Sequence, residues 1–438
     1  MPVSRQNKSA KSASGIVTSS KGSFAANGDH SSRYLPQLDG ARGLAAVFVV
    51  VAHFNPAPLK VAEGSAIGGL MRVAGQLALG NLAVIFFFAL SAFLLTFLAR
   101  VEYETTGDFS IRRFLLRRVL RIWPLYFTVV GVAFLFQGLH AHMPGEFGAS
   151  EETWRWITAR IPLYAFFAGN WSLAFNHVNG YLDHSPGPLR ILWSVNVEEQ
   201  FYLLYPLVIL LVWRFSKSRW GILGGLLLAG WVFRLWFCQL PVTDGKFGSS
   251  GGMYYATFSY IDVLICGGVA GWCFAGGGVS NSRWLTSWWT GPLLVSAAAM
   301  VGAIWSPHVW SPYDALSVAG YSIAGIVFAL LLFWLATRPD HPLVRVLASR
   351  PMRLLGTFSF GVYMWHIVSN LCLAAMLNRW GARDSFWYLS PWFRLGCSLG
   401  LAISFAALSW RLIERPFLQI KRRFAPGRAK THPDSTAL

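Results

Sequence analysis

Ten stretches of this chain are apolar over enough residues to cross a lipid bilayer, and this feature restricts the fold more than any other. A helix needs about 20 predominantly apolar residues to span the hydrocarbon core. Charged residues make up 13% of the chain, against about 25% in soluble domains. Since backbone polar groups find no water inside a bilayer, such segments must be helical. The sequence therefore predicts an all-α polytopic membrane protein, a bundle of about ten transmembrane helices.

The loops between the predicted spans differ in their basic residues, and this difference indicates the orientation. The spans cover residues 38–56, 77–99, 118–138, 200–215, 219–237, 257–275, 289–305, 316–336, 355–377 and 394–413. With the N-terminus inside, the inner segments carry 26 Lys and Arg residues and the outer segments carry 9. Inner loops are enriched in these residues, so both termini are predicted to be cytoplasmic. An eleventh apolar stretch, residues 157–170, is too short to span and is predicted to be re-entrant or interfacial.

Composition also separates the ends of the chain from its membrane part. Residues 1–36 lack both hydrophobic periodicity and the apolar core of a secretory signal, so they are predicted to form a disordered cytoplasmic tail. Residues 37–418 form the membrane domain, and residues 419–438 form a basic cytoplasmic tail.

The net charge of +18 is concentrated in the inner segments, which indicates membrane topology and no nucleic-acid partner. The five cysteines have no metal-binding spacing and are predicted to be buried free thiols, and no metal site is expected.

Ionisable side chains inside a bilayer are costly, so each needs a partner, a wet cavity or a function. Arg42 and His53 lie in the first predicted span, eleven positions apart. At about 100° per residue, this spacing is about 20° from three full turns, so the two residues share a helix face. They are about 16 Å apart along the axis, which places Arg42 at the cytoplasmic mouth and His53 towards the outer leaflet. The alternative is an interfacial arginine with a core histidine bonded to a neighbouring helix.

Two adjacent carboxylates, Glu198 and Glu199, open the fourth predicted span at the outer face. Asn196 and Glu199 have the spacing of a capping box, so Glu199 has an alternative role as a helix cap. Glu198 lies about 100° away, with Tyr202 and Tyr205 on its own face, and can point into the bundle. Glu198 is therefore the better candidate for a functional carboxylate.

Further ionisable residues occur in later spans. Arg234 and Asp262 lie near the outer ends of the fifth and sixth spans, and Ser359, Tyr363 and His366 share one face of the ninth. A structural ion pair and a helix-to-helix hydrogen bond are the respective alternatives. Gathered in one bundle, these side chains indicate a buried polar pathway.

Six blocks of the sequence occur in a characteristic order over about residues 34–420. They are Leu38–Gly43 with His53, Phe86–Leu95, Arg118–Tyr126, Trp193–Pro206, Tyr363–His366 and Leu412–Phe417. In this order they resemble the acyltransferase family 3 integral membrane proteins, which O-acylate carbohydrates and related acceptors. One block alone would be weak evidence, whereas six ordered blocks are specific.

The resemblance implies a membrane acyltransferase domain over residues 37–418, in the multi-pass setting of a bacterial cytoplasmic membrane. The implied reaction moves an acyl group, above all acetyl, from cytosolic acyl-CoA to a hydroxyl of a surface or exported polysaccharide at the periplasmic face. Lipopolysaccharide O-antigen, an exopolysaccharide and a lipid-linked precursor are the acceptors considered. The essential Arg and His of the family's first helix fall on Arg42 and His53, and its Glu falls on Glu198. The hydrolase-like domain that some members append is not expected here.

The implied mechanism uses neutral His53 as a general base on the acceptor hydroxyl, because the pKa of histidine lies near the working pH. Glu198, with Glu199 beside it, would orient the imidazole and stabilise its charged form. A covalent acyl-His53 intermediate is the main variant. The candidates for binding the donor's phosphates are Arg42, Arg118 and Arg121, and those for positioning substrates are Asp262, Arg234, His366 and Tyr363.

Two other functions fit parts of the pattern. In a proton-coupled transporter, the buried ionisable residues would form a relay, although the sequence lacks a matching pair of broken helices in two halves. A non-catalytic scaffold of a polysaccharide-assembly complex would explain the apolar segments but not the ionisable residues within them.

Overall fold

The computed structural model describes residues 34–54, 66–141, 155, 158–178, 187–240, 249–276, 287–306, 315–379, 390–421 and 424. Apart from Tyr34, these residues belong to one unit, Leu35–Leu438. The predicted tails, residues 1–36 and 419–438, lie largely outside the described residues. The last described helix extends to Lys421, three residues into the predicted C-terminal tail.

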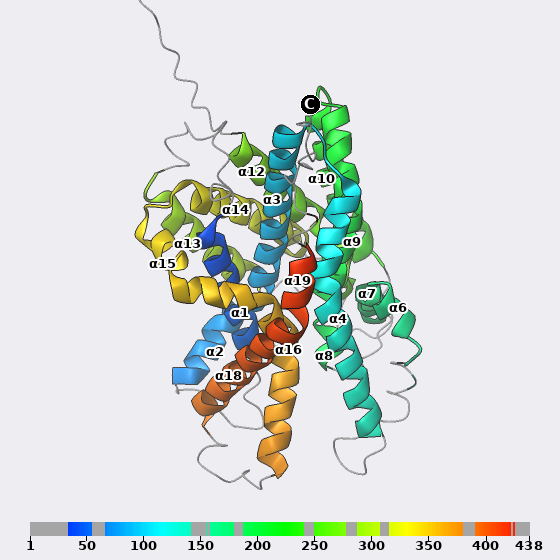
Figure 1. Cartoon of the computed structure of the whole chain (residues 1–438), viewed down its shortest axis with the longest axis vertical. Helices are drawn as coiled ribbons and strands as arrows, with labels where there is room; N and C mark the ends of the chain where they lie inside the picture. The colour runs from blue at the N-terminus through cyan, green and yellow to red at the C-terminus, as the bar shows by residue number, and fades with distance from the viewer. Residues whose placement is uncertain are drawn as a thin grey trace, which may run out of the picture. The chain divides into compact units, whose positions relative to one another are not determined.

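Helices make up the fold, and no β-strand occurs in the described ranges, which confirms the predicted all-α class (Figure 1). The first half contains α1 (Pro36–Ala52), α2 (Ala66–Gln76), α3 (Leu79–Thr106), α4 (Ile111–Ala141), α6 (Ile161–Ala165), α7 (Gly169–Val178), α8 (Gly187–Arg190), α9 (Trp193–Arg214) and α10 (Arg219–Cys238). The second half contains α11 (Ser249–Tyr255), η2 (Thr257–Tyr260), α12 (Ile261–Ala275), α13 (Thr290–Trp305), α14 (Ala315–Thr337), α15 (Pro342–Leu347), α16 (Arg350–Arg379), α18 (Pro391–Ser409), η4 (Trp410–Glu414) and α19 (Arg415–Lys421).

Eight stretches of described helix are long and apolar enough to cross a membrane, judged by length and composition. They are Leu79–Thr106, Ile111–Leu135, Pro188–Arg214, Arg219–Cys238, Thr257–Ala275, Ala315–Thr337, Arg350–Leu377 and Trp392–Lys421. Each overlaps a predicted span. The other two predicted spans are the shorter helices α1, with 17 residues, and α13, with 16 residues. The chain is a multi-pass membrane protein, and the count of ten crossings with both termini inside stays a prediction.

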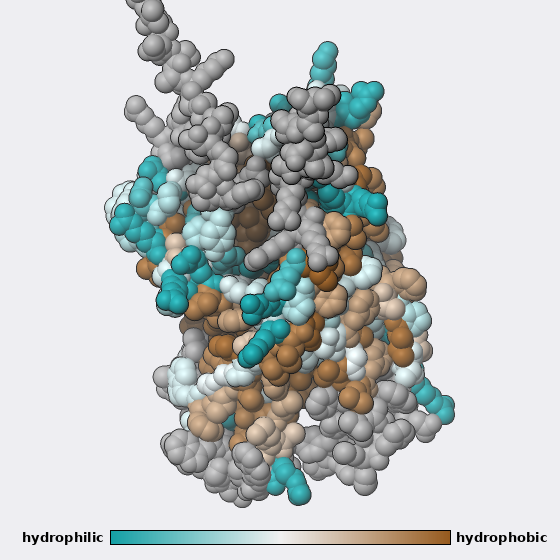
Figure 2. Space-filling view, in the orientation of Figure 1, coloured by the Kyte–Doolittle hydropathy of each residue, from teal (hydrophilic) through white to brown (hydrophobic). Residues whose placement is uncertain are grey.

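Large apolar side chains are exposed on the outer surfaces of these helices, as a lipid-facing surface requires. Leu203, Leu228 and Leu412 are each more than 60% exposed. Figure 2 shows apolar side chains over much of the visible face. Soluble monomers rarely expose contiguous apolar surface of this extent.

The stretch at residues 157–170, predicted to be too short to span, contains short helices in its described part, residues 158–170. Within it lie α6, with 5 residues, and the start of α7, with 10 residues. Neither helix is long enough to cross a bilayer.

Glycines on both partners let α1 and α16 approach closely. A Cβ atom at Gly43 would lie 2.7 Å from the backbone nitrogen of Gly356, and one at Gly356 would lie 2.1 Å from the carbonyl oxygen of Asp39. Larger residues would force the helices apart. The contact joins the helix that carries Arg42 to the one that carries His366.

A second small-residue contact joins α12 to α3. Gly267 and Gly271 lie four positions apart on one face of α12, where a Cβ atom would lie 2.3 Å from the carbonyl oxygen of Ala89 and 2.2 Å from that of Phe93. This is the small-residue spacing that packs helices closely in membranes.

All five cysteines are free, but only Cys238 is fully buried, so the predicted burial holds only in part.

Candidate active site

Arg42 is fixed at the crossing of α1 and α16. Its Nε donates to Ser359 Oγ at 3.0 Å, and its Nη2 donates to the carbonyl oxygen of Gly356 at 2.9 Å. The same Nη2 pairs with Asp39 Oδ1 at 3.0 Å. The close glycine contact therefore sets the position of the predicted donor-binding arginine.

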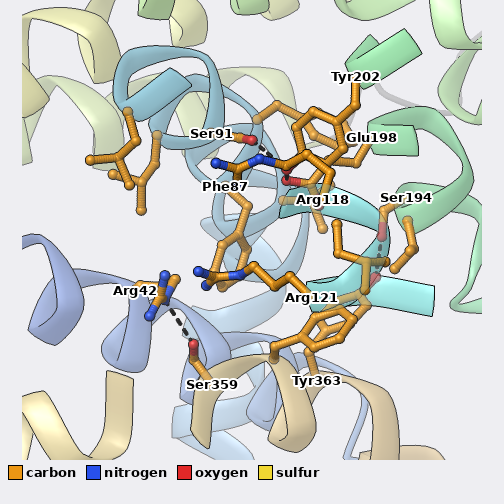
Figure 3. A pocket seen from close by; sticks show the side chains of 17 residues that line it. Arg42, Phe87, Ser91, Arg118, Arg121, Ser194, Glu198, Tyr202, Ser359 and Tyr363 are labelled. Atoms are coloured by element: carbon orange, nitrogen blue, oxygen red, sulfur yellow. Dashed lines mark hydrogen bonds between the residues drawn. The ribbon is translucent and has the colours of Figure 1, made fainter. Parts of the chain in front are cut away.

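A cavity of about 120 Å³ lies beside Arg42, with walls from α1, α3, α4, α9 and α16 (Figure 3). Its charged lining residues are Arg42, Arg118, Arg121 and Glu198. The structure thus brings together the three arginines that were predicted to bind the donor. They come from two helices far apart in the sequence.

Positive charge predominates in this cavity. Figure 3 shows the guanidinium groups of Arg42 and Arg121 facing each other, and the two groups interact electrostatically. Arg118 has a buried Nε with no hydrogen-bond partner among the described residues. Within the described ranges, neither Arg118 nor Arg121 forms an ion pair with a carboxylate. Such a site favours an anionic ligand.

Glu198 is the one acidic residue in the cavity lining. Its Oε1 accepts a hydrogen bond from the hydroxyl of Tyr202, which also bonds to Ser91 Oγ at 2.6 Å. The guanidinium of Arg118 lies over the Tyr202 ring, 5.6 Å from its centroid. Glu198 is therefore held on the cavity wall next to Arg118.

Glu199 points elsewhere, as a residue one position along a helix must. Its Oε2 accepts a hydrogen bond from Trp123 Nε1 at 2.9 Å, and it does not line the cavity. The alternative of a capping box is wrong, because α9 begins at Trp193 and Asn196 already lies inside the helix. Asn196 Oδ1 instead accepts from the hydroxyl of Tyr126 at 2.8 Å.

His53 and His366 meet beyond the cavity, with their ring centroids 5.1 Å apart. His53 Nδ1 lies 2.9 Å from the carbonyl oxygen of Val49, and His366 Nδ1 lies 2.6 Å from that of Tyr363. A carbonyl oxygen can only accept, so Nδ1 carries the proton in both rings and Nε2 carries the free lone pair. His366 Nε2 is buried and has no partner among the described residues.

This geometry corrects the predicted role of Glu198 as the group that orients the His53 imidazole. The Val49 carbonyl, four residues earlier on α1, holds that ring. No hydrogen bond joins Glu198 to His53 within the described parts of the chain. His53 is exposed, whereas His366 is buried behind it. Tyr363 connects the two regions, because it lines the cavity and its ring centroid lies 5.8 Å from that of His366.

Comparison with known proteins identifies the family of this chain. A family model described as an acyltransferase domain matches residues 35–411. The chain belongs to this acyltransferase family. The match covers all the charged lining of the cavity and both histidines, and it confirms the family that the six sequence blocks resemble.

The chain is similar to two proteins from bacteria. YrhL of Bacillus subtilis is 26% identical over 394 residues, which are 88% of this chain and 55% of YrhL. Peptidoglycan O-acetyltransferase OatA of Listeria monocytogenes is 24% identical over 399 residues, which are 88% of this chain and 56% of OatA. The chain thus spans about half the length of these relatives. No solved structure gives a significant match.

Arg234 and Asp262, which were predicted to position substrates, form an ion pair with each other and do not line the cavity. Arg234 Nη1 and Nη2 donate to the two carboxylate oxygens of Asp262 at 2.9 and 2.8 Å, and both side chains are buried. Ser259 and Ser322 complete the set, since Arg234 also donates to the carbonyl oxygen of Ser259 and to Ser322 Oγ. Of the four substrate candidates, Tyr363 lines the cavity and His366 adjoins it.

Sequence reasoning missed several polar groups of the site. Ser91 and Ser194 line the cavity, and Ser194 Oγ bonds to the hydroxyl of Tyr363. Both serines lie within the six sequence blocks, but a serine in an apolar span carries no signal of its role. The Val49 carbonyl gives no signal at all, because every residue has one.

Proposed function

We propose that this chain is a membrane O-acetyltransferase that moves an acetyl group from cytosolic acetyl-CoA to a glycan hydroxyl at the outer face of a bacterial cytoplasmic membrane. One observation carries the proposal: Tyr363 lies between an arginine-lined cavity and a pair of histidines, one of them exposed. Family membership supports acyl transfer as the reaction class.

The donor end of the site fits a polyanionic thioester. Arg42, Arg118 and Arg121 bind the donor's phosphates, for which the guanidinium fork is well shaped. Arg42 needs no large movement, because Ser359 and Gly356 already hold it. The pantetheine arm then follows the face of α1 from Arg42 towards His53, a length of about 16 Å along the helix axis.

Glu198 serves the donor rather than the histidine. As the acidic residue of the lining, it can accept hydrogen bonds from the amide N–H groups of the pantetheine arm. A carboxylate acceptor makes a stronger hydrogen bond than a neutral one. The hydroxyl of Tyr202 holds the carboxylate by a hydrogen bond to Oε1.

The acceptor end of the site is His53. Its Nε2 takes the proton of the acceptor hydroxyl as the hydroxyl oxygen attacks the thioester carbonyl carbon. The new ester C–O bond forms, the C–S bond breaks, and the departing thiolate takes the proton from the imidazolium. The hydrogen bond from Nδ1 to the Val49 carbonyl keeps the reactive tautomer in place throughout.

We further propose that the acceptor is a cell-surface polysaccharide. The name of the Listeria relative specifies peptidoglycan, so peptidoglycan fragments are the first acceptors to test. Lipopolysaccharide O-antigen and exopolysaccharide are the alternatives within the same class.

Purified protein in detergent or nanodiscs, supplied with acetyl-CoA and glycan fragments, tests this function. The proposal expects thiol release that depends on the acceptor, and an acetyl ester on the glycan by mass spectrometry. A transporter would move its substrate without consuming thioester, and a scaffold would do neither. Thioester that remains intact with every glycan class would contradict the proposal.

A further inference from the structure

The last helical segment, η4 with α19, packs against the basic start of α4 (Figure 1). The carbonyl oxygen of Phe424, just beyond α19, accepts a hydrogen bond from Arg117 Nη1 at 3.0 Å. Lys421, three residues earlier, is half-buried and interacts electrostatically with Arg117, Arg118 and Arg121. The C-terminal helix thus adds a cation to the arginines of the donor site.

Glu414 and Lys421 present one face of this segment to the site. They are seven positions apart, which at about 100° per residue is about 20° short of two turns. Both interact electrostatically with Arg121 and Arg42. Lys421 therefore lies near enough to these arginines to interact with them, and it is half-buried.

Cations outnumber carboxylates around Lys421 within the described residues. Arg117 pairs with the buried carboxylate of Glu102 at 2.8 Å, and Arg42 pairs with Asp39. In contrast, Arg118, Arg121 and Lys421 form no ion pair with any described carboxylate.

Glu198 and Glu414 are acidic groups that interact with Arg118 and Arg121, and an anionic ligand would compensate the positive charge that remains. A ligand that carries phosphate groups fits this cluster.

Lys421 lies at the end of this cluster that is remote from the histidines. It does not line the cavity, and it interacts electrostatically with the arginines of α4 and with Arg42, whereas His53 lies at the other end of α1. In a coenzyme A thioester, the 3′-phosphate is on the ribose, further from the reacting carbonyl than the diphosphate is. A lysine suits this terminal phosphate as a compact point charge.

We propose that Lys421 binds the 3′-phosphate of the donor, so that the C-terminal helix makes the site selective for coenzyme A over carriers that lack this phosphate. The inference rests on the proposed function, since it assumes an acyl-CoA donor. It adds a specificity-determining residue outside the cavity.

The test compares the affinities of full-length protein for coenzyme A and for dephospho-coenzyme A, which lacks the 3′-phosphate. Wild type is expected to bind coenzyme A roughly tenfold or more tightly, as one charge-assisted contact allows. In Lys421→Ala this preference should fall to less than about threefold, while affinity for dephospho-coenzyme A stays near that of wild type. Lys421→Arg should keep most of the preference.

Arg415→Ala is the matched control, because Arg415 is an exposed cation on the same helix; it should keep the full preference. If Lys421→Ala is not recovered as folded protein, Lys421→Gln takes its place. An undiminished preference in the lysine variant, or an equal loss for both ligands, would overturn the inference and leave the proposed function intact. A wild-type protein that binds neither ligand would instead overturn the proposed donor, and the inference with it.

Discussion

At the scale of single residues, the two histidines and the two glutamates show how neighbouring groups acquire different roles. Backbone carbonyls fix the same tautomer in His53 and His366, but only His53 is exposed. Glu198 lines the cavity, whereas Glu199 bonds to Trp123 outside it. The exposure of each histidine and the direction of each glutamate side chain therefore distinguish residues of the same type as candidates for function.

The glutamates offer a matched pair of substitutions. Glu198→Gln is expected to lower kcat/KM for acetyl-CoA about tenfold or more, because it weakens a charge-assisted acceptor in the cavity. Glu199→Gln keeps an oxygen acceptor for Trp123 and should change kcat/KM less than about threefold. Steady-state kinetics of the two purified variants measures both. Equal losses in the two variants would refute the assignment.

At the scale of helices, the α1–α16 crossing has glycines where a Cβ atom would meet the backbone of the neighbouring helix. In Gly356→Ala the added methyl would lie 2.1 Å from the carbonyl oxygen of Asp39, so we expect a loss of stability of about 1–3 kcal/mol. Gly224→Ala on α10 is the control, because a Cβ atom there meets nothing within 4 Å. Its melting temperature in detergent should equal or exceed that of wild type. An unchanged melting temperature in Gly356→Ala would contradict this packing.

The buried Arg234–Asp262 pair holds α10 against α12. Asp262→Asn leaves the buried guanidinium uncompensated, and we expect a loss of about 3–5 kcal/mol of unfolding free energy. Asp340→Asn removes one member of an exposed pair, Arg345–Asp340, and should change that free energy by less than about 1 kcal/mol. Activity per folded molecule should stay normal in both variants. A folded Asp262→Asn protein with a raised KM for acceptor would instead support the predicted substrate role.

The helices themselves could be predicted from the sequence, because the length of an apolar run decides whether it spans a bilayer. Helical periodicity is local, so a shared face for Arg42 and His53 could be predicted, and both residues contact α16. The partners of these residues could not be predicted. His366 contacts His53, and Arg118 lines the cavity, because particular helices pack together. Hydropathy identifies the helices but does not predict which of them are neighbours. The orientation of the His53 ring depends on a backbone carbonyl, which leaves no trace in the sequence.

At the scale of the whole molecule, the basic loops predict which ends of the helices face the cytoplasm. In a background without native cysteines, Asp108→Cys should react with an impermeant thiol reagent only after the cells are opened. Ala159→Cys should react in intact cells. Both positions are exposed in the structure, and inner loops carry the basic excess. The reverse labelling pattern would invert the topology and place the arginine cavity on the outer side.

The central claim is that an acetyl group passes from an inner donor to an outer glycan by way of His53. Oriented membrane vesicles with labelled acetyl-CoA on the cytoplasmic side and glycan acceptor on the other test it directly. Wild type should place labelled acetyl ester on the glycan. His53→Ala, at equal folded amount, should lose transfer by about 10²- to 10⁴-fold, the usual contribution of a general base. Transfer by His53→Ala at a rate near that of wild type would contradict the account.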